Sequence, residues 1–298
     1  MAEHHHEHLH MHMHGADVKY SLGTAAAVTA SFAVLEALGG WWTGSLALLS
    51  DAGHMLTDAA ALGLGTLAAW MARLPPSRRH SYGLGRAEVV AAMINATAML
   101  AIVIAIAWEA VVRFRDPAPV NGLVAALIAA AGLALNLWVL RRLAPHHHDM
   151  NTRAARLHVL GDVLGSAAAL ISGAAIAATG WTPIDALASL AICLLIAASA
   201  ARLMRESLHA LMEGVPQGLS VEAIATEMAR VDGVVSVHDL HVWTLSGSRI
   251  ALSAHVVMRS MSDWHRMLGD LQHRLHDAFG IDHVTLQPES TTRPLVRH

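Results

Sequence analysis

Six long apolar stretches constrain the fold of this chain more than any other feature. They cover residues 18–40, 45–71, 87–112, 119–143, 154–179 and 183–204. About 20 largely apolar residues are enough for a helix to cross the hydrocarbon core of a bilayer. Only 14% of the residues are charged, whereas an ordinary soluble domain has about 25%. The sequence therefore predicts an α-helical membrane protein with six transmembrane helices.

The positions of the arginines predict how these helices are oriented. The connection between the first and second stretches and that between the fifth and sixth contain no Lys or Arg. Arginines gather instead in the second-to-third connection, in the fourth-to-fifth connection and after the last stretch: Arg73, Arg78, Arg79 and Arg86; Arg141, Arg142, Arg153 and Arg156; Arg202 and Arg205. Such loops stay in the cytoplasm. We therefore expect a multi-pass protein of the cell inner (cytoplasmic) membrane with both termini cytoplasmic.

Two ionisable pairs lie inside the second and fifth apolar stretches, His54 with Asp58 and His158 with Asp162. A spacing of four residues puts both members of a pair on one face of a helix, about one turn apart. Ionisable side chains are costly in hydrocarbon and usually mark an ion path or a proton relay. Two imidazoles and two carboxylates suit a divalent metal such as zinc. The two pairs therefore predict one shared metal site within the membrane.

Other polar residues of the apolar stretches have simpler interpretations. Glu36, Glu109 and Asp185 lie near the ends of stretches, where a place at the membrane interface is favoured and a role in transport is the alternative. Asp51 stands at the start of the second stretch and is expected to cap that helix. Asn136 is expected to form a hydrogen bond between helices.

From about residue 209 the pattern is that of a small soluble domain. Two amphipathic helices and three strands are predicted in the order α-β-β-α-β, over residues 220–230, 234–245, 249–259, 262–279 and 283–288. This order suits an α+β ferredoxin-like domain. The expected organisation is a His-rich cytoplasmic tail (1–16), a six-helix transmembrane domain (17–208) and a cytoplasmic metallochaperone-like domain (209–298).

A second candidate metal site lies in this soluble domain. Ser246-Gly247 is a hairpin signal, and a two-residue turn there would put His238 opposite His255, within reach of one ion. His241 has the opposite parity and is expected on the other face of the sheet. His283 and Glu289 flank the last strand and are candidates for further ligands. The alternative is an exposed pair of polar cross-strand residues.

Two further histidine groups favour weak capture of metal ions, with a solvated loop as the alternative for the second. They are the tail that ends at His14 and the tract His146, His147 and His148. A formal net charge of −3 gives no basic face for nucleic acid. The single cysteine, Cys193, excludes a disulfide or a cysteine-based zinc site within one chain.

Three function classes are compatible with a metal site in a membrane. A metalloenzyme needs an open metal position beside a general base, and four filled positions argue against it. No phosphate-binding Gly-Lys-Ser/Thr loop is present. A metal sensor or metal-storing membrane protein is the alternative to a transporter. We therefore expect no enzymatic activity, and divalent metal and protons as the partners.

Four motifs resemble those of the cation diffusion facilitator family, which includes vertebrate and bacterial zinc transporters. They are LSDAGHMLTD at 49–58, SYGLGRAE at 81–88, HVLGD at 158–162, and VHDLHVW at 237–243 followed by SAHV at 253–256. The resemblance implies six helices, a cytoplasmic metal-binding domain, a homodimer and exchange of metal for protons.

The resemblance also implies roles for individual residues. It assigns transport to His54, Asp58, His158 and Asp162, and this two-histidine, two-aspartate set is similar to the zinc-preferring version of the family. It assigns cytoplasmic zinc binding to His238 and His255. Some bacterial relatives hold zinc in the loop at 81–88. Here His80 is kept, but Ser77 and Leu84 stand where further ligands would be.

Overall fold

The computed structural model describes residues 27–143, 150–246 and 249–291, with only the backbone given for residues 142, 143 and 150–158. The chain divides into two compact units. The first contains the described residues up to Gly63 together with Asn95–Arg202. The second contains Leu64–Ile94 together with the described residues from Leu203 onward.

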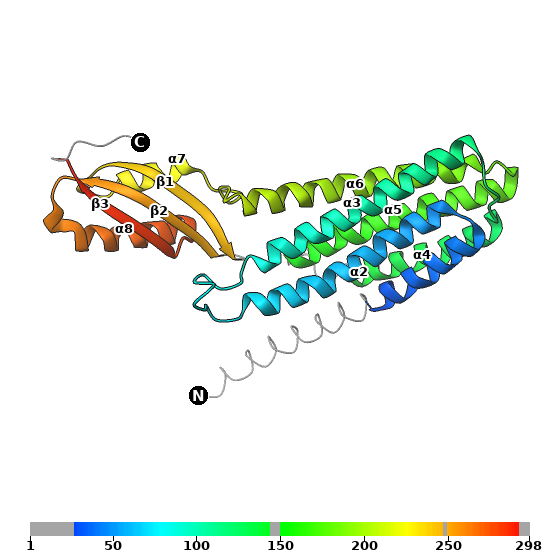
Figure 1. The fold of residues 1–298 in the computed structure, drawn as a ribbon, viewed down its shortest axis with the longest axis horizontal. Helices are drawn as coiled ribbons and strands as arrows, with labels where there is room; N and C mark the ends of the chain where they lie inside the picture. The colour runs from blue at the N-terminus through cyan, green and yellow to red at the C-terminus, as the bar shows by residue number, and fades with distance from the viewer. Residues whose placement is uncertain (1–26, 144–149, 247–248, 292–298) are drawn as a thin grey trace, which may run out of the picture. The chain divides into compact units, whose positions relative to one another are not determined.

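Long helices dominate the first two thirds of the chain (Figure 1). A helical segment over residues 27–43 is followed by five helices: α2 (Leu46–Ala72), α3 (Ala87–Arg115), α4 (Gly122–Leu143), α5 (Met150–Thr179) and α6 (Pro183–Leu211). In the described part of the chain, these five are long and apolar enough to cross a membrane. The prediction of a helical membrane region is confirmed for them. The first expected span, 18–40, lies partly outside the described residues.

Large apolar side chains point outward from these helices, as lipid contact requires. Trp41, Trp42, Trp108 and Leu194 are each more than 70% exposed. The interior contains many small residues, which allow close contact between helices. One buried cluster contains Ala47, Ala125 and Ala169 together with Val103 and Ile192.

Glycines bring α4 and α5 into close contact. A Cβ atom built on Gly173 of α5 would lie 2.6 Å from the backbone nitrogen of Ala126 in α4. A Cβ on Gly122 of α4 would lie 2.7 Å from the carbonyl oxygen of Gly173. Small residues at such crossings allow helix backbones to approach in a membrane. The contact fixes the position of α5, which contains Asp162.

The start of α2 is fixed by a buried carboxylate from α6. Asp185 accepts hydrogen bonds from the Ser45 hydroxyl at 2.7 Å and from the Leu46 backbone N–H at 2.5 Å. These N–H groups have no partner within their own helix, and the positive end of the helix dipole favours an anion there. Asp185 is 2% exposed. Asp185 therefore lies at the end of its own helix, where its carboxylate caps the start of another.

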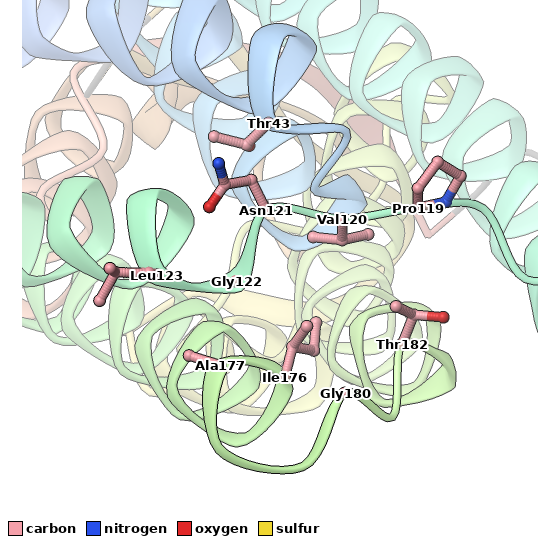
Figure 2. A pocket seen from close by; sticks show the side chains of 10 residues that line it. All are labelled: Thr43, Pro119, Val120, Asn121, Gly122, Leu123, Ile176, Ala177, Gly180 and Thr182. Atoms are coloured by element: carbon pink, nitrogen blue, oxygen red, sulfur yellow. The ribbon is translucent and has the colours of Figure 1, made fainter.

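Three connections surround an open pocket of about 760 Å³ at this end of the first unit. Figure 2 shows Thr43, the stretch Pro119–Leu123 and the turn between α5 and α6 around it. The backbone N–H of Asn121 donates to the carbonyl of Thr43 at 2.9 Å and ties two of the connections together. None of the ten lining residues is ionisable. This pocket therefore lacks the ligands of a metal site.

The C-terminal part of the second unit has the predicted order of elements. These are α7 (Val221–Ala229), β1 (Val234–Ser246), β2 (Arg249–Met258), the short 3-10 helix η1 (Met261–Asp263), α8 (Trp264–Phe279) and β3 (His283–Ser290). The sheet order is β1-β2-β3, with β1 antiparallel and β3 parallel to β2 (Figure 1). Ile224 of α7, Leu252 of β2 and Leu271 of α8 belong to one buried core.

The hairpin between β1 and β2 has the predicted histidine pair but not the predicted turn. His238 lies opposite His255, as predicted from a two-residue turn, but Ser246 lies opposite Arg249. Ser246 is therefore part of β1 and not of a turn with Gly247, and bulges in β1 correct the register. One bulge lies between His238 and His241, where Asp239 has a φ of +47°. A bulge is an extra residue in one strand that has no partner on the neighbouring strand.

The bulge also changes the face on which His241 lies. His241 pairs with Ser253, and Ser253 is on the same face of β2 as His255 because the two are separated by two residues. The core side of β2 carries Leu252 and Ala254 instead. His241 thus shares a face with His238, and the expectation of the opposite face was wrong because it assumed an unbroken alternation.

Candidate metal centres

The second and fifth helices bring three of the four predicted membrane ligands together. In α2, His54 Nδ1 lies 3.2 Å from Asp58 Oδ2. His54 Nε2 lies 3.7 Å from Oδ1 of Asp162 in α5. One ligand atom from each residue lies within 4.8 Å of those of the other two. Donor atoms this close together are suited to sharing one ion.

His158 is the fourth predicted ligand. It lies in α5, four residues before Asp162, so the helix puts both residues on one face. Its side chain lies outside the described part of the chain. The structure therefore gives its place on the backbone, and its part in the site stays a prediction.

The membrane group is shielded from solvent. The side chains of His54, Asp58 and Asp162 are 13%, 19% and 4% exposed. Two carboxylates and one imidazole at this depth make a site of net negative charge when both acids are ionised. Desolvated charges are costly unless they are paired, and a divalent cation or protons would supply the pairing. The same atoms can therefore bind either metal or protons, but not both at once.

A hydrogen-bonded network borders this group. Asp51 of α2 is fully buried, and its Oδ2 accepts a 2.7 Å hydrogen bond from Ser166 of α5. Ser166 accepts a 3.1 Å hydrogen bond from Asn136 of α4. A side chain at Gly165 would overlap the Asp51 carboxylate. The predicted interhelical role of Asn136 is confirmed, whereas Asp51 pairs across helices instead of capping its own.

Glu36 was missed as a candidate because it stands near the end of an apolar stretch. It is fully buried in the helical segment 27–43, which the expected interfacial position did not predict. Neither carboxylate oxygen has a hydrogen-bond partner among the described residues. A lone acid in an apolar stretch was the available signal, but its burial depends on how the helices pack.

The cytoplasmic histidines form a second candidate centre, on the sheet. The rings of His238 and His255 have centroids 5.1 Å apart. Glu289 of β3 bridges them, with its carboxylate oxygens 3.0 Å from His238 Nε2 and 2.6 Å from His255 Nδ1. Hydrogen bonds from His255 and His238 lower the pKa of Glu289. Asp239, at the bulge, lies 3.4 Å from His238 and belongs to the same group of possible ligands.

His283 does not join this centre. It lies opposite Ala251, whereas His255 lies opposite Gln287. Its ring makes an edge contact with Tyr82, with centroids 5.9 Å apart.

His80, in the loop between α2 and α3, is in a turn closed by backbone hydrogen bonds with Ser77. The tracts ending at His14 and at 146–148 lie outside the described residues.

Comparison with known proteins covers both parts of the chain. The family described as "Cation efflux transmembrane domain" matches residues 22–212, and "Cation efflux protein, cytoplasmic domain" matches residues 216–291. The zinc transporter ZitB of Escherichia coli is 44% identical over 266 residues, which cover 88% of this chain and 84% of that protein.

Two further relatives from other bacteria extend the comparison. The cadmium, cobalt and zinc/H(+)-K(+) antiporter of Bacillus subtilis is 36% identical, over 87% of this chain and 85% of its own length. The metal cation efflux system protein CzcD of Cupriavidus metallidurans is 35% identical, over 90% of this chain and 86% of its own. The likeness therefore runs through nearly the whole length of all three proteins.

Proposed function

This chain belongs to the cation diffusion facilitator family of membrane transporters, and from that premise we propose that it exports zinc from the cytoplasm in exchange for protons. The proposed carrier site is formed by His54, Asp58, His158 and Asp162. The observation that carries the proposal is the convergence of the first, second and fourth of these within 4.8 Å, from two helices long enough to cross a membrane. We place the protein in the inner membrane with both termini in the cytoplasm, as the arginine distribution favours.

Zinc is the favoured substrate because of the ligand types. Zinc accepts imidazole nitrogen and carboxylate oxygen in a tetrahedral set of four. Magnesium and calcium prefer six or more oxygen ligands. Two aspartates also neutralise the charge of a divalent ion, which lowers the cost of its place within the bilayer. The E. coli relative is named as a zinc transporter, which supports the same choice.

Exchange follows from competition at the carrier site. Zinc binds from the cytoplasm when the imidazoles and carboxylates are deprotonated. The helical bundle then closes to the cytoplasm and opens to the other side. Protons from that side bind the same atoms, and zinc leaves because its ligands are no longer available. The return of the protonated bundle completes one exchange, with no covalent chemistry required.

The cytoplasmic centre has a separate proposed role. His238, His255 and Glu289 come from three strands of one sheet and supply two nitrogens and a carboxylate. We propose that zinc binds there and promotes close pairing of the domains of two protomers. In this role the ion regulates transport and is not the ion carried.

Uptake of zinc into sealed vesicles that contain the purified protein tests the proposal. A pH gradient should drive zinc uptake by the wild type. Asp58→Asn should reduce it by more than the roughly 10- to 100-fold typical of second-shell changes at metal sites. Glu109→Gln is a matched control, since Glu109 is an acid of α3 that pairs with Arg113 at 2.8 Å and lies outside the site. Zinc binding without uptake by the wild type would instead indicate a sensor or a storage protein.

A further inference from the structure

Glu36 is an acid of the first unit that the carrier mechanism above does not use, and its surroundings are unusual. Its side chain is fully buried. Both carboxylate oxygens lack a hydrogen-bond partner among the described residues. Within that part of the chain, the oxygens of Asp185 accept hydrogen bonds from Ser45 and Leu46, and Asp51 accepts one from Ser166.

The helix opposite Glu36 gives its carboxylate room but no hydrogen-bond donor. A Cβ atom on Gly132 of α4 would lie 3.1 Å from Glu36 Oε1 and 2.7 Å from the ring of Phe32. Asn136 lies one turn further along the same face of α4, but its amide donates to Ser166. Gly132 of α4 therefore lies beside the carboxylate of Glu36 and beside the ring of Phe32.

The charged groups that act on Glu36 are all acidic in the described part of the chain. They are Asp51 of α2 and Asp162 of α5. A buried carboxylate without a partner is costly, and two neighbouring carboxylates of the same sign add repulsion. A proton on Glu36 would remove both costs.

The hydrogen-bonded network of Asp51 and Ser166 lies next to the carrier site. Asp51 lies three residues before His54 on α2, and Ser166 lies four residues after Asp162 on α5. The two helices are antiparallel, because the Asp51–Ser166 and His54–Asp162 contacts run in opposite directions along them. The network thus lies about one turn from the carrier site, toward the end of the bundle where α2 begins and α5 ends.

We propose that Glu36 is a proton-binding residue coupled to the carrier site, and that it releases its proton when zinc binds there. The inference rests on the proposed function, because it assigns one of the exchanged protons. A divalent ion beside Asp162 adds positive charge to the cluster, so the O–H bond of Glu36 breaks, the carboxylate keeps the electron pair and the proton passes to water. When zinc leaves, the carboxylate takes up a proton again from the side opposite the cytoplasm.

The number of protons released per bound zinc ion tests this directly. It is measured on the full-length protein in detergent, by titration calorimetry with zinc in buffers of different ionisation enthalpy. We expect Glu36→Gln to release up to about one proton fewer than the wild type. Glu109→Gln should equal the wild type. The zinc of the cytoplasmic centre contributes equally to all three proteins and cancels in the comparison. Equal proton release by Glu36→Gln and the wild type would overturn the proposal.

Further measurements separate the proposal from a folding defect and from failure of the proposed function. Glu36→Leu is a second neutral replacement, and both variants should keep the thermal stability of the wild type because the protonated acid carries no charge. Zinc should also reduce the infrared band of protonated carboxylic acids more in the wild type than in Glu36→Gln, and an equal reduction in both proteins would overturn the proposal. Unchanged zinc binding in Asp58→Asn would contradict the carrier site instead.

Discussion

Single residues should decide which ions the proposed carrier site accepts. His54 stands between Asp58 and Asp162, with contacts of 3.2 Å and 3.7 Å. Its nitrogen is the borderline ligand of the three, whereas both aspartates supply hard oxygen. We therefore expect the selectivity of the proposed site to depend most on this residue and on His158.

Replacing His54 by Asp should relax discrimination between metals. The change exchanges a nitrogen ligand for an oxygen ligand with a different reach, and the zinc-preferring geometry weakens. We expect the ratio of cadmium to zinc flux into vesicles to rise several-fold. Expression and melting temperature serve as controls for folding. An unchanged ratio would contradict the assignment of His54 as a selective ligand.

Glu289 should make the cytoplasmic sheet sensitive to acid. Its pKa is lowered by the hydrogen bonds from His255 and His238. A carboxylate with a lowered pKa stabilises the fold above its unfolded pKa, and this contribution is lost as the pH falls through the folded value. Metal-free protein should therefore lose protection of β1–β3 against hydrogen exchange at acidic pH, after correction for intrinsic rates. In Glu289→Gln this loss should be smaller.

At the scale of helices and strands, most bounds were predictable from the sequence, whereas irregular features were not. The apolar stretches predicted α2 to α6 closely because their length follows from bilayer thickness, and alternation predicted β1, β2 and β3. The bulge at Asp239 was not predictable, because an Asp with a φ of +47° leaves no apolar signal. The burial of Glu36 was missed for a related reason, since packing of the helical segment 27–43 against Gly132 decides it.

The crossing of α4 and α5 should not tolerate a larger side chain. Gly173→Val places new atoms against the backbone of Ala126, where a Cβ atom would already be 2.6 Å away. Overpacking of this kind costs about 1–3 kcal/mol, so both melting temperature and zinc flux should fall. Gly63→Ala in α2 is the matched control, since its Cβ would meet nothing within 4 Å. Equal stability of both variants would contradict the close contact.

At the scale of the whole molecule, the proposed carrier site and the proposed regulatory site belong to different parts of the chain. Removal of both cytoplasmic imidazoles, in His238→Ala/His255→Ala, should abolish zinc-promoted pairing of the cytoplasmic domains. Zinc flux should persist at a reduced rate, because the carrier site is intact. Crosslinking yield with and without zinc, measured beside vesicle flux, checks both. Complete loss of flux in a folded dimer would contradict this division of roles.

The central claim is that protons and zinc compete for one site in the membrane. It is tested most directly by vesicles with equal zinc on both sides and an imposed pH gradient. In the wild type, zinc should accumulate in the acidic compartment as protons leave it, and the direction of net zinc movement should reverse when the pH gradient is reversed. Asp162→Asn should show no uphill movement. Zinc that stays at equal concentration in wild-type vesicles, or uphill movement by Asp162→Asn at the wild-type rate, would contradict the claim.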